Sequence, residues 1–162
     1  EMCKCRALFT KFGGHKLAAG LSLEEENVER FRRTINELCE LTSQDQMPKV
    51  SIDMQLPLAY VTEELIEELE LLEPFGKGNT KPLFAEKNLK VQNLRVIGKN
   101  QNVLKFQVLD RNGRKMEAIY FGEVQECMEY LQGKEEVALT FYPSVNEYRG
   151  NKSIQITVVN YQ

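Results

Sequence analysis

The only histidine of the 162-residue chain, His15, follows two adjacent glycines in the stretch KFGGHKLAAG. Glycines at 13 and 14 can adopt positive φ and leave room for an anion such as phosphate against the backbone N–H groups. His15 can donate a hydrogen bond to that anion, and Lys11 and Lys16 can add positive charge. The same residues also fit a tight turn in which a backbone carbonyl satisfies His15, so the spacing alone leaves both interpretations open.

The other residues that could bind a metal ion or act as nucleophiles do not form a pattern typical of either role. The four cysteines lack the C-x2-C pairs of a zinc site and the density of a secreted disulfide scaffold, which predicts reduced, structural thiols. The three aspartates are far apart and show no D-x-D spacing, whereas a two-metal phosphoesterase centre needs a cluster of such ligands. We therefore expect no catalytic residue, metal site or cofactor in this chain.

Charge is unevenly distributed along the chain, although the net charge is only −3. Bases predominate in residues 1–20, residues 53–73 contain seven acids and no base, and residues 81–122 contain nine bases against three acids. Such asymmetry can focus a polyanion onto part of an acidic molecule. The alternative is that these charges simply solvate the outer faces of strands.

The chain shows no apolar run of about 20 residues that could span a membrane and no signal-peptide pattern. We therefore expect a soluble, cytoplasmic protein that does not bind membranes. Because the sequence starts with Glu1 in the middle of a pattern, we interpret it as a fragment.

The first third of the chain predicts a small mixed unit. The glycines indicate a turn that leads into a strand over 18–23, and apolar residues at helical spacing predict a helix over 23–41. Polar residues up to Pro48 suggest a boundary. Alternation then predicts a strand around 50–56, and Thr62 is the expected N-cap of a second helix with an acidic outer face.

Short strands dominate the remainder. Alternating patterns predict strands over 88–98, 102–110 and 116–122, with Asn112-Gly113 as the hairpin signal, then a helix over 123–132, and strands over 135–145 and 152–162. Three strands, a helix and two strands is the order of an OB-fold, a small barrel that commonly binds oligonucleotides or oligosaccharides.

Three stretches also resemble a known family. KFGGHKLAAGLSL resembles the glycine-glycine-histidine motif of the DHH-associated domain, and LEPFGKGNTKPLF and NEYRGNKSIQI resemble the C-terminal part of the RecJ-like single-stranded-DNA-specific exonucleases. Thr80 departs from this pattern, where proline is expected. The resemblance implies an α+β, mainly β chain: the C-terminal part of an α/β DHH-associated domain over 1–46, a connecting strand and helix over 47–80, and a five-stranded OB-fold barrel over 81–162, with its helix between strands 3 and 4.

The resemblance also implies a function in DNA repair and recombination. In this family an upstream DHH nuclease domain binds Mn²⁺ or Mg²⁺ and hydrolyses single-stranded DNA from the 5′ end, so this chain would bind the DNA in partnership with that domain. Other bacterial repair proteins are further potential partners. The resemblance gives a phosphate-binding role to Lys11, Gly13, Gly14, His15 and Lys16.

Strand alternation predicts which barrel residues are available to nucleic acid. We expect Leu104, Phe106 and Val108 to point inward, together with Ile119, Phe121, Val137, Leu139 and Phe141. The tyrosines and cations between them are the types that bind single strands, because rings stack on bases while cations follow phosphates. The candidates are Arg95, Lys99, Lys105, Tyr120, Tyr142, Tyr148 and Arg149.

Two other functions fit the same sequence. The barrel could be a protein-interaction module that uses its acidic helix near residues 63–70. Alternatively, the parent protein could be another DHH-family phosphoesterase that acts on oligoribonucleotides. In the EPFGKGN turn, we expect Phe75 to insert between helix and barrel, in preference to DNA contacts by Lys77 or Asn79.

Overall fold

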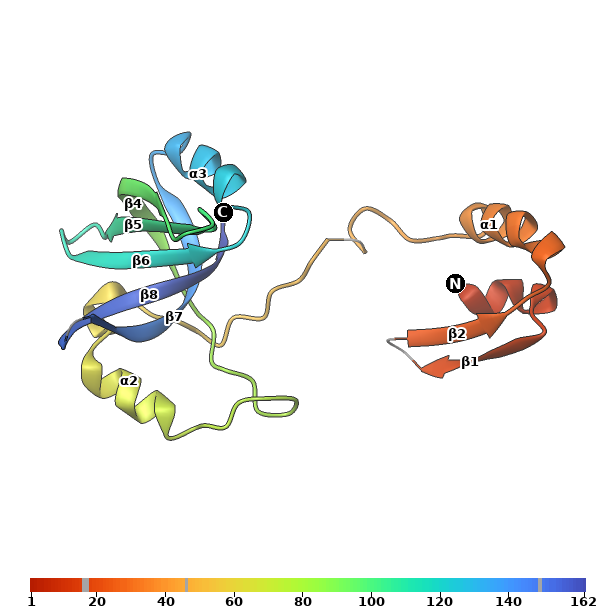
Figure 1. The fold of residues 1–162 in the computed structure, drawn as a ribbon, viewed down its shortest axis with the longest axis horizontal. Helices are drawn as coiled ribbons and strands as arrows, with labels where there is room; N and C mark the ends of the chain where they lie inside the picture. Colours follow the sequence, from red (N-terminus) through yellow and green to blue (C-terminus); the bar gives the residue numbers. More distant parts are fainter. Residues whose placement is uncertain (16–17, 46, 149) are drawn as a thin grey trace. The chain divides into compact units, whose positions relative to one another are not determined.

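The computed structural model describes residues 1–15, 18–45, 47–148 and 150–162, with only the backbone at Tyr148. These residues form two compact units, Glu1–Lys49 and Val50–Gln162. Figure 1 labels the helices and strands of both units. The fold is a mixed α+β arrangement in which strands predominate.

The first unit is a β-hairpin packed with short helices. Strand β1 (Lys11–His15) pairs antiparallel with β2 (Ala18–Ser22), and the helical elements are η1 (Met2–Leu8), η2 (Glu25–Asn27) and α1 (Val28–Glu37). The ring of Phe9 stacks on Phe12 at 5.4 Å between centroids and meets Phe31 edge-on at 5.2 Å. Lys4 donates through Nζ to the carbonyl oxygen of Leu38 at 3.0 Å, which joins η1 to the C-terminal end of α1.

Two predictions for this unit were wrong in detail. Gly13 and Gly14 are not in a turn but in β1, and neither has a positive φ. The predicted helix over 23–41 is shorter: a 3₁₀ turn occupies Glu25–Asn27, and α1 begins at Val28 and ends at Glu37. At Gly14 the structural reason for glycine is instead a close strand contact, since a Cβ there would lie 2.5 Å from the carbonyl oxygen of Ala18.

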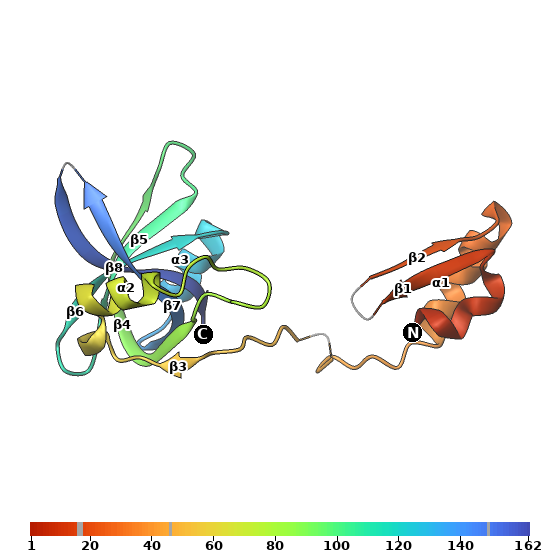
Figure 2. The same ribbon diagram turned by 90° about the horizontal axis from the view of Figure 1, so that it is seen from below.

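The second unit is a closed barrel. Its long strands are β4 (Phe84–Ile97), β5 (Val103–Leu109), β6 (Lys115–Phe121), β7 (Val137–Tyr148) and β8 (Asn151–Tyr161), with α3 (Val124–Gln132) between β6 and β7. The strands are ordered β4-β5-β6-β8-β7, β6 and β8 are parallel, and β4 pairs with β7 to close the sheet. This connectivity is consistent with an OB-fold. Figure 2 shows β7 and β8 as a long hairpin.

Strand β4 can pair with both β5 and β7 because it bends. Asn88 and Asn93 adopt positive φ of 62° and 55°, and each lies inside a register shift, between Glu86 and Leu89 and between Gln92 and Arg95. Asparagine is one of the few residues that tolerates this left-handed conformation. The two bulges increase the local twist and curve the strand around the barrel.

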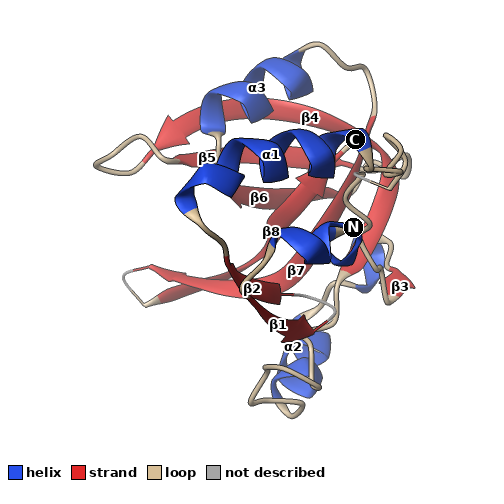
Figure 3. Cartoon of the chain, turned by 90° about the vertical axis from the view of Figure 1, so that its right-hand side faces the viewer, coloured by secondary structure: helices blue, strands red, loops and turns tan. Residues whose placement is uncertain are grey.

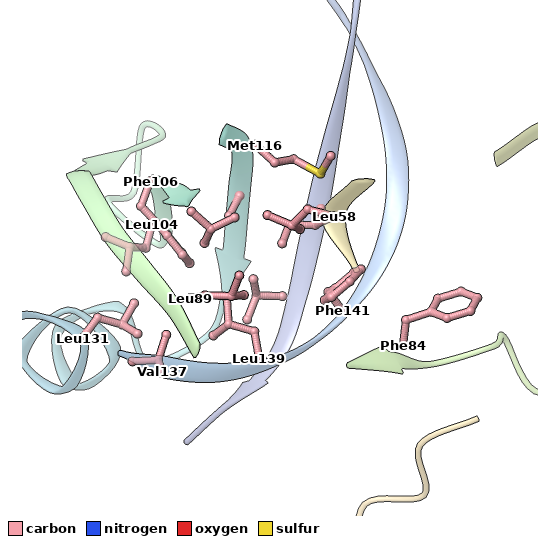
Figure 4. Packing of buried hydrophobic residues seen from close by; sticks show 14 of the residues in the cluster. Leu58, Phe84, Leu89, Leu104, Phe106, Met116, Leu131, Val137, Leu139 and Phe141 are labelled. Carbon is pink, nitrogen blue, oxygen red and sulfur yellow. The ribbon is translucent and has the colours of Figure 1, made fainter. Parts of the chain in front are cut away.

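The barrel core is built from alternate residues of the strands (Figure 4). Leu104, Phe106 and Val108 of β5 are at most 1% exposed, which confirms the predicted orientation of that strand. The three predicted core residues of β7 are also buried: Val137, Leu139 and Phe141. Helix α3 adds Val124, Cys127 and Leu131 to the same core, so its apolar side seals one end of the barrel. Burial raises the pKa of the Cys127 thiol to about 12, as expected for a structural thiol.

The predicted orientation of β6 was wrong. Met116 and Ala118 are buried, whereas Phe121 is 58% exposed and Ile119 is only half-buried. Tyr120, predicted to face outward, packs against the core and meets the ring of Tyr161 edge-on at 5.7 Å. Burial raises the pKa of the Tyr120 hydroxyl.

The segment before the barrel is less regular than predicted. Of the strand expected around 50–56, only β3 (Met54–Gln55) forms. It pairs parallel with β4 and so adds a sixth strand to the sheet of the five barrel strands. After η3 (Leu58–Tyr60), Thr62 accepts a hydrogen bond from the N–H of Leu65 at 3.2 Å and caps α2 (Glu63–Glu70), as predicted. Helices α2 and α3 lie at opposite ends of the barrel (Figures 1 and 3).

The β5–β6 hairpin has the turn that Asn112-Gly113 predicted. Gly113 adopts a φ of 83°, and the chain reversal is fixed by Asp110, which is 8% exposed. One carboxylate oxygen of Asp110 accepts from the N–H groups of Asn112 and Arg114 at 2.8 and 2.9 Å. The carboxylate thus stabilises the turn.

Candidate nucleic-acid interface

A continuous row of side chains crosses the outer face of the barrel from β4 to β7. The strand register places Arg95 opposite Lys105, Lys105 opposite Ile119, Ile119 opposite Thr157, and Thr157 opposite Tyr142. Directly opposed residues on neighbouring strands share a face of the sheet. Three residues that the sequence proposed separately, Arg95, Lys105 and Tyr142, therefore belong to one surface, which we call the outer row.

The Tyr142 end of the outer row carries a cation and an aromatic ring together. The Nζ of Lys81, a residue that the sequence analysis did not select, lies 5.0 Å from the centre of the Tyr142 ring and 5.9 Å from that of Phe75. Phe75 lines a hollow with Ile66 of α2 and Pro143 of β7, which agrees with its predicted structural role. A half-buried ring with a lysine beside it can stack on a base while the lysine contacts a phosphate.

A hydrogen-bonded network covers the middle of the face. Asn93 donates to Gln107 at 2.9 Å, Gln107 donates to Glu117 at 2.8 Å, and Lys105 forms an ion pair with Glu117 at 3.0 Å. Burial alone would raise the pKa of the Glu117 carboxyl. The hydrogen bonds from Gln107 and Lys105 and the charges of Lys105 and Arg95 outweigh that effect and lower it. Glu117 is consequently a carboxylate at neutral pH.

Phe121 is the aromatic residue of this face that sequence reasoning missed. Its register partner is Val103, which is opposite Ile97, so an apolar row lies next to the outer row. The error came from assigning Ile119 and Phe121 to the core because both are apolar. Glu117 points to the same side of β6 as these two residues. A charged residue at that position could have shown that this side faces outward.

The loops at the ends of these strands hold the other predicted contacts. Lys99 is exposed in the loop between β4 and β5. Tyr148 ends β7, where its backbone pairs with Asn151, while Arg149 lies outside the described residues. In OB-folds these two loops flank the face formed by the second and third strands. Among the barrel candidates whose side chains the structure describes, Tyr120 is the one whose ring packs against the core instead of lying on this surface.

The hairpin of the first unit places its predicted phosphate-binding residues on one face. Lys11, Gly13 and His15 alternate along β1 and are all exposed, and Gly13 is opposite Gly20 of β2. No atom lies within 4 Å of the positions that Cβ atoms would occupy at Gly13 and Gly20. The result is a strip of bare backbone between Lys11 and His15 that a ligand could approach closely.

Gly14 has the opposite strand parity from these residues, and Lys16 lies outside the described residues. Gly14 and His15 line a shallow hollow with Met2 and Phe12. The structure therefore keeps the bare backbone that the sequence suggested, but through an extended hairpin and not through positive φ.

Two features are absent from the described residues. No three His, Cys, Asp or Glu side chains there are grouped closely enough to hold a metal ion. Within the same residues, no helix is both long enough and apolar enough to cross a membrane.

Comparisons of the sequence and of the structure with known proteins point to the same group of proteins. The chain is 30% identical over 162 residues to the single-stranded-DNA-specific exonuclease RecJ of Bacillus subtilis and 31% identical over 155 residues to that of Escherichia coli. It superimposes on the crystal structure of RecJ in complex with Mg²⁺ from Thermus thermophilus with a TM-score of 0.71, at 22% identity, over 99% of this chain and 24% of that chain. The last similarity shows the fold.

The similarities cover almost all of this chain but a small part of each relative. The alignments include 98% and 94% of this chain, and 20% and 26% of the Bacillus and Escherichia proteins. Residues 52–160, which contain the whole barrel apart from the last two residues of the chain, match the family model of the RecJ OB domain. The chain therefore belongs to the RecJ OB domain family.

Proposed function

We propose that this chain is the C-terminal portion of a RecJ-like exonuclease and holds single-stranded DNA on the outer row of its barrel. The observation that carries the proposal is the row itself, in which strand pairing joins Arg95 and Lys105 at one end to Tyr142 at the other, where Lys81 lies beside the Tyr142 ring. Arg95 and Lys81 would follow the phosphates, Lys105 would contact the strand between them, and Tyr142 and Phe121 would stack on bases. Lys99, Tyr148 and Arg149 would extend the contact through the loops.

The proposal also assigns roles to the other parts of this chain and to the rest of the parent enzyme. Residues 1–46 would complete a DHH-associated domain, residues 47–80 would connect it to the barrel over 81–162, and an upstream DHH domain would hold Mn²⁺ or Mg²⁺. That domain would hydrolyse DNA from the 5′ end during repair and recombination in the bacterial cytoplasm. Lys11, Gly13, His15 and Lys16 would present a substrate phosphate to it, with Gly14 fixing the strand pair.

The two alternatives considered from the sequence are less well supported. The match is specifically to the RecJ OB domain, which argues against a DHH phosphoesterase that acts on oligoribonucleotides. A protein-interaction role through α2 rests on its acidic residues alone, whereas the outer row combines charge, aromatic rings and strand register.

Fluorescence anisotropy with labelled single-stranded and duplex DNA at two salt concentrations tests the proposal. We expect the chain to prefer the single strand and its affinity to fall as salt rises, because bound phosphates release counterions. Tyr142→Ala should weaken binding by about 1–3 kcal/mol, the usual contribution of a stacked base.

Tyr60→Ala is the matched control, because Tyr60 is 67% exposed in η3 and lies outside the outer row. It should bind like the unchanged chain. Absence of binding at low salt, or equal losses in the two variants, would contradict the proposed function.

A further inference from the structure

The network in the middle of the outer face borders a hollow of about 290 Å³. Its polar lining comes from Asn93, Arg95, Lys105, Gln107 and Glu117, and Ile97 adds an apolar wall. The hollow therefore combines hydrogen-bond donors, one carboxylate and an apolar surface. A planar, polar group of moderate size fits this chemistry better than an alkyl chain does.

Glu117 makes the centre of this hollow unsuitable for a phosphate. Its carboxylate is one-third exposed and would repel a phosphate placed against it. The cations around it can still hold phosphates at the border of the hollow. A single strand that crosses the face would then turn its bases, and not its backbone, toward Glu117.

The network also holds the carboxylate in a fixed orientation. Gln107 contacts one oxygen and Lys105 the other, at 2.8 and 3.0 Å, and Asn93 in turn fixes the Gln107 amide. Each carboxylate oxygen can accept a second hydrogen bond, and the Lys105 ammonium has two further donors. Glu117 and Lys105 thus present two acceptors beside a donor.

This pattern complements the Watson–Crick edge of guanine. Guanine has two adjacent donors, N1–H and the N2 amino group, and beside them the acceptor O6. Cytosine, adenine and thymine each have a single donor group on that edge, so none can engage both carboxylate oxygens. The edge is accessible only when the base is unpaired.

We propose that the hollow is a guanine-selective subsite in which Glu117 accepts from N1–H and the N2 amino group while Lys105 donates to O6. This inference rests on the proposed single-strand binding and adds base selectivity to it. The contacts of Arg95 and Tyr142 remain independent of sequence, so the selectivity is confined to one base of the bound strand.

Anisotropy titrations of the chain with labelled oligothymidylates of about 15 nucleotides test this subsite. One strand contains only thymine, one has a central dG, and one has a central deoxyinosine, which lacks the N2 amino group. We expect the dG strand to bind about fivefold more tightly than the thymine strand, with most of that preference lost for deoxyinosine.

The Glu117→Gln variant distinguishes recognition of guanine by the carboxylate from electrostatic repulsion of the DNA by its charge. The variant should bind the all-thymine strand at least as tightly as the unchanged chain, because a negative charge is removed, and should lose the dG preference. Glu126→Gln, an equal charge change at an exposed position of α3, should keep the preference. Thermal melting of both variants checks that they are folded.

The outcomes distinguish this inference from the proposed function. Equal binding of the three strands would overturn the guanine subsite and leave single-strand binding intact. A dG preference that persists in Glu117→Gln would overturn the assignment to Glu117. If the chain binds none of the strands, both the subsite and the proposed function fail.

Discussion

The hairpin unit and the barrel differ in how much buried side-chain packing holds their strands in place. In Glu1–Lys49, Cys5 is the one apolar residue among those described that is less than 9% exposed, and the rings of Phe9, Phe12 and Phe31 provide the main packing. In Val50–Gln162, eighteen buried residues form one core. The barrel can therefore fix its outer side chains by itself, whereas the hairpin has much less packing to fix Lys11 and His15.

The largest effect should come from Phe141→Ala. Phe141 is 0% exposed in the barrel core, so its truncation removes buried contacts and leaves a cavity. We expect a loss of about 3–5 kcal/mol in the free energy of unfolding. Denaturant unfolding followed by circular dichroism measures it.

Phe121→Ala is the control for this change, since Phe121 is 58% exposed on β6. Its effect on stability should be below about 1 kcal/mol. Similar losses in both variants would mean that the inner and outer faces have been assigned wrongly.

A smaller effect is expected for Thr62→Ala. Thr62 caps α2 by accepting from the N–H of Leu65, and removing such a cap usually costs about 1 kcal/mol. Thr62→Ser, which keeps the hydroxyl, should recover most of the stability in the same unfolding experiment. A Ser variant as unstable as the Ala variant would show that the cap is not the cause.

Glu86→Gln should change how stability depends on pH. Burial raises the pKa of the Glu86 carboxyl above its ordinary value of 4.5, against the hydrogen bond that it accepts from the N–H of Leu58. A raised acid pKa favours folding at low pH, and this contribution is lost as pH rises through the raised value. Glutamine keeps an acceptor for Leu58 without the charge.

The variant should therefore be slightly more stable than the unchanged chain at about pH 7 and equal to it at about pH 4. Thermal melting at both values measures the difference. A variant that is less stable at neutral pH would show that the charged form of Glu86 stabilises the fold.

The smallest effect should come from removing residues 1–49. Every residue of the barrel core lies between Leu56 and Val158, so we expect residues 50–162 to fold alone and to melt at nearly the same temperature. Calorimetry of the shortened chain measures this. Loss of a cooperative transition would show that the barrel depends on the hairpin unit.

Sequence alternation predicted the orientation of a barrel strand correctly where its inner residues are apolar and its outer residues are polar. In β5, Leu104, Phe106 and Val108 alternate with polar residues, and the predicted orientation is confirmed. In β6, Ile119 and Phe121 are apolar on the outer face while Tyr120 has enough apolar surface to pack inside, so alternation alone favoured the wrong face. An exposed ring on the outer face of a strand resembles a core residue in sequence.

Segments whose structure depends on distant partners were predicted less well. Val50, Ile52 and Met54 alternate as in a strand, but all three are exposed, and only Met54–Gln55 finds a partner in β4. The outer row itself could not be predicted, because it joins β4, β5, β6, β8 and β7 through long-range register. Lys81 was missed for the same reason. It lies just before β4, and its contact with Tyr142 depends on the pairing of β4 with β7 that closes the sheet.

The most direct test of the outer row is NMR mapping of the amide signals of the ¹⁵N-labelled chain during titration with a single-stranded oligothymidylate. We predict that the largest shifts follow the register, at Arg95, Lys105, Ile119, Thr157 and Tyr142, with Phe121 beside them. Shifts confined to α2 or α3, or no shifts at all, would contradict the central claim that this face of the barrel binds single-stranded DNA.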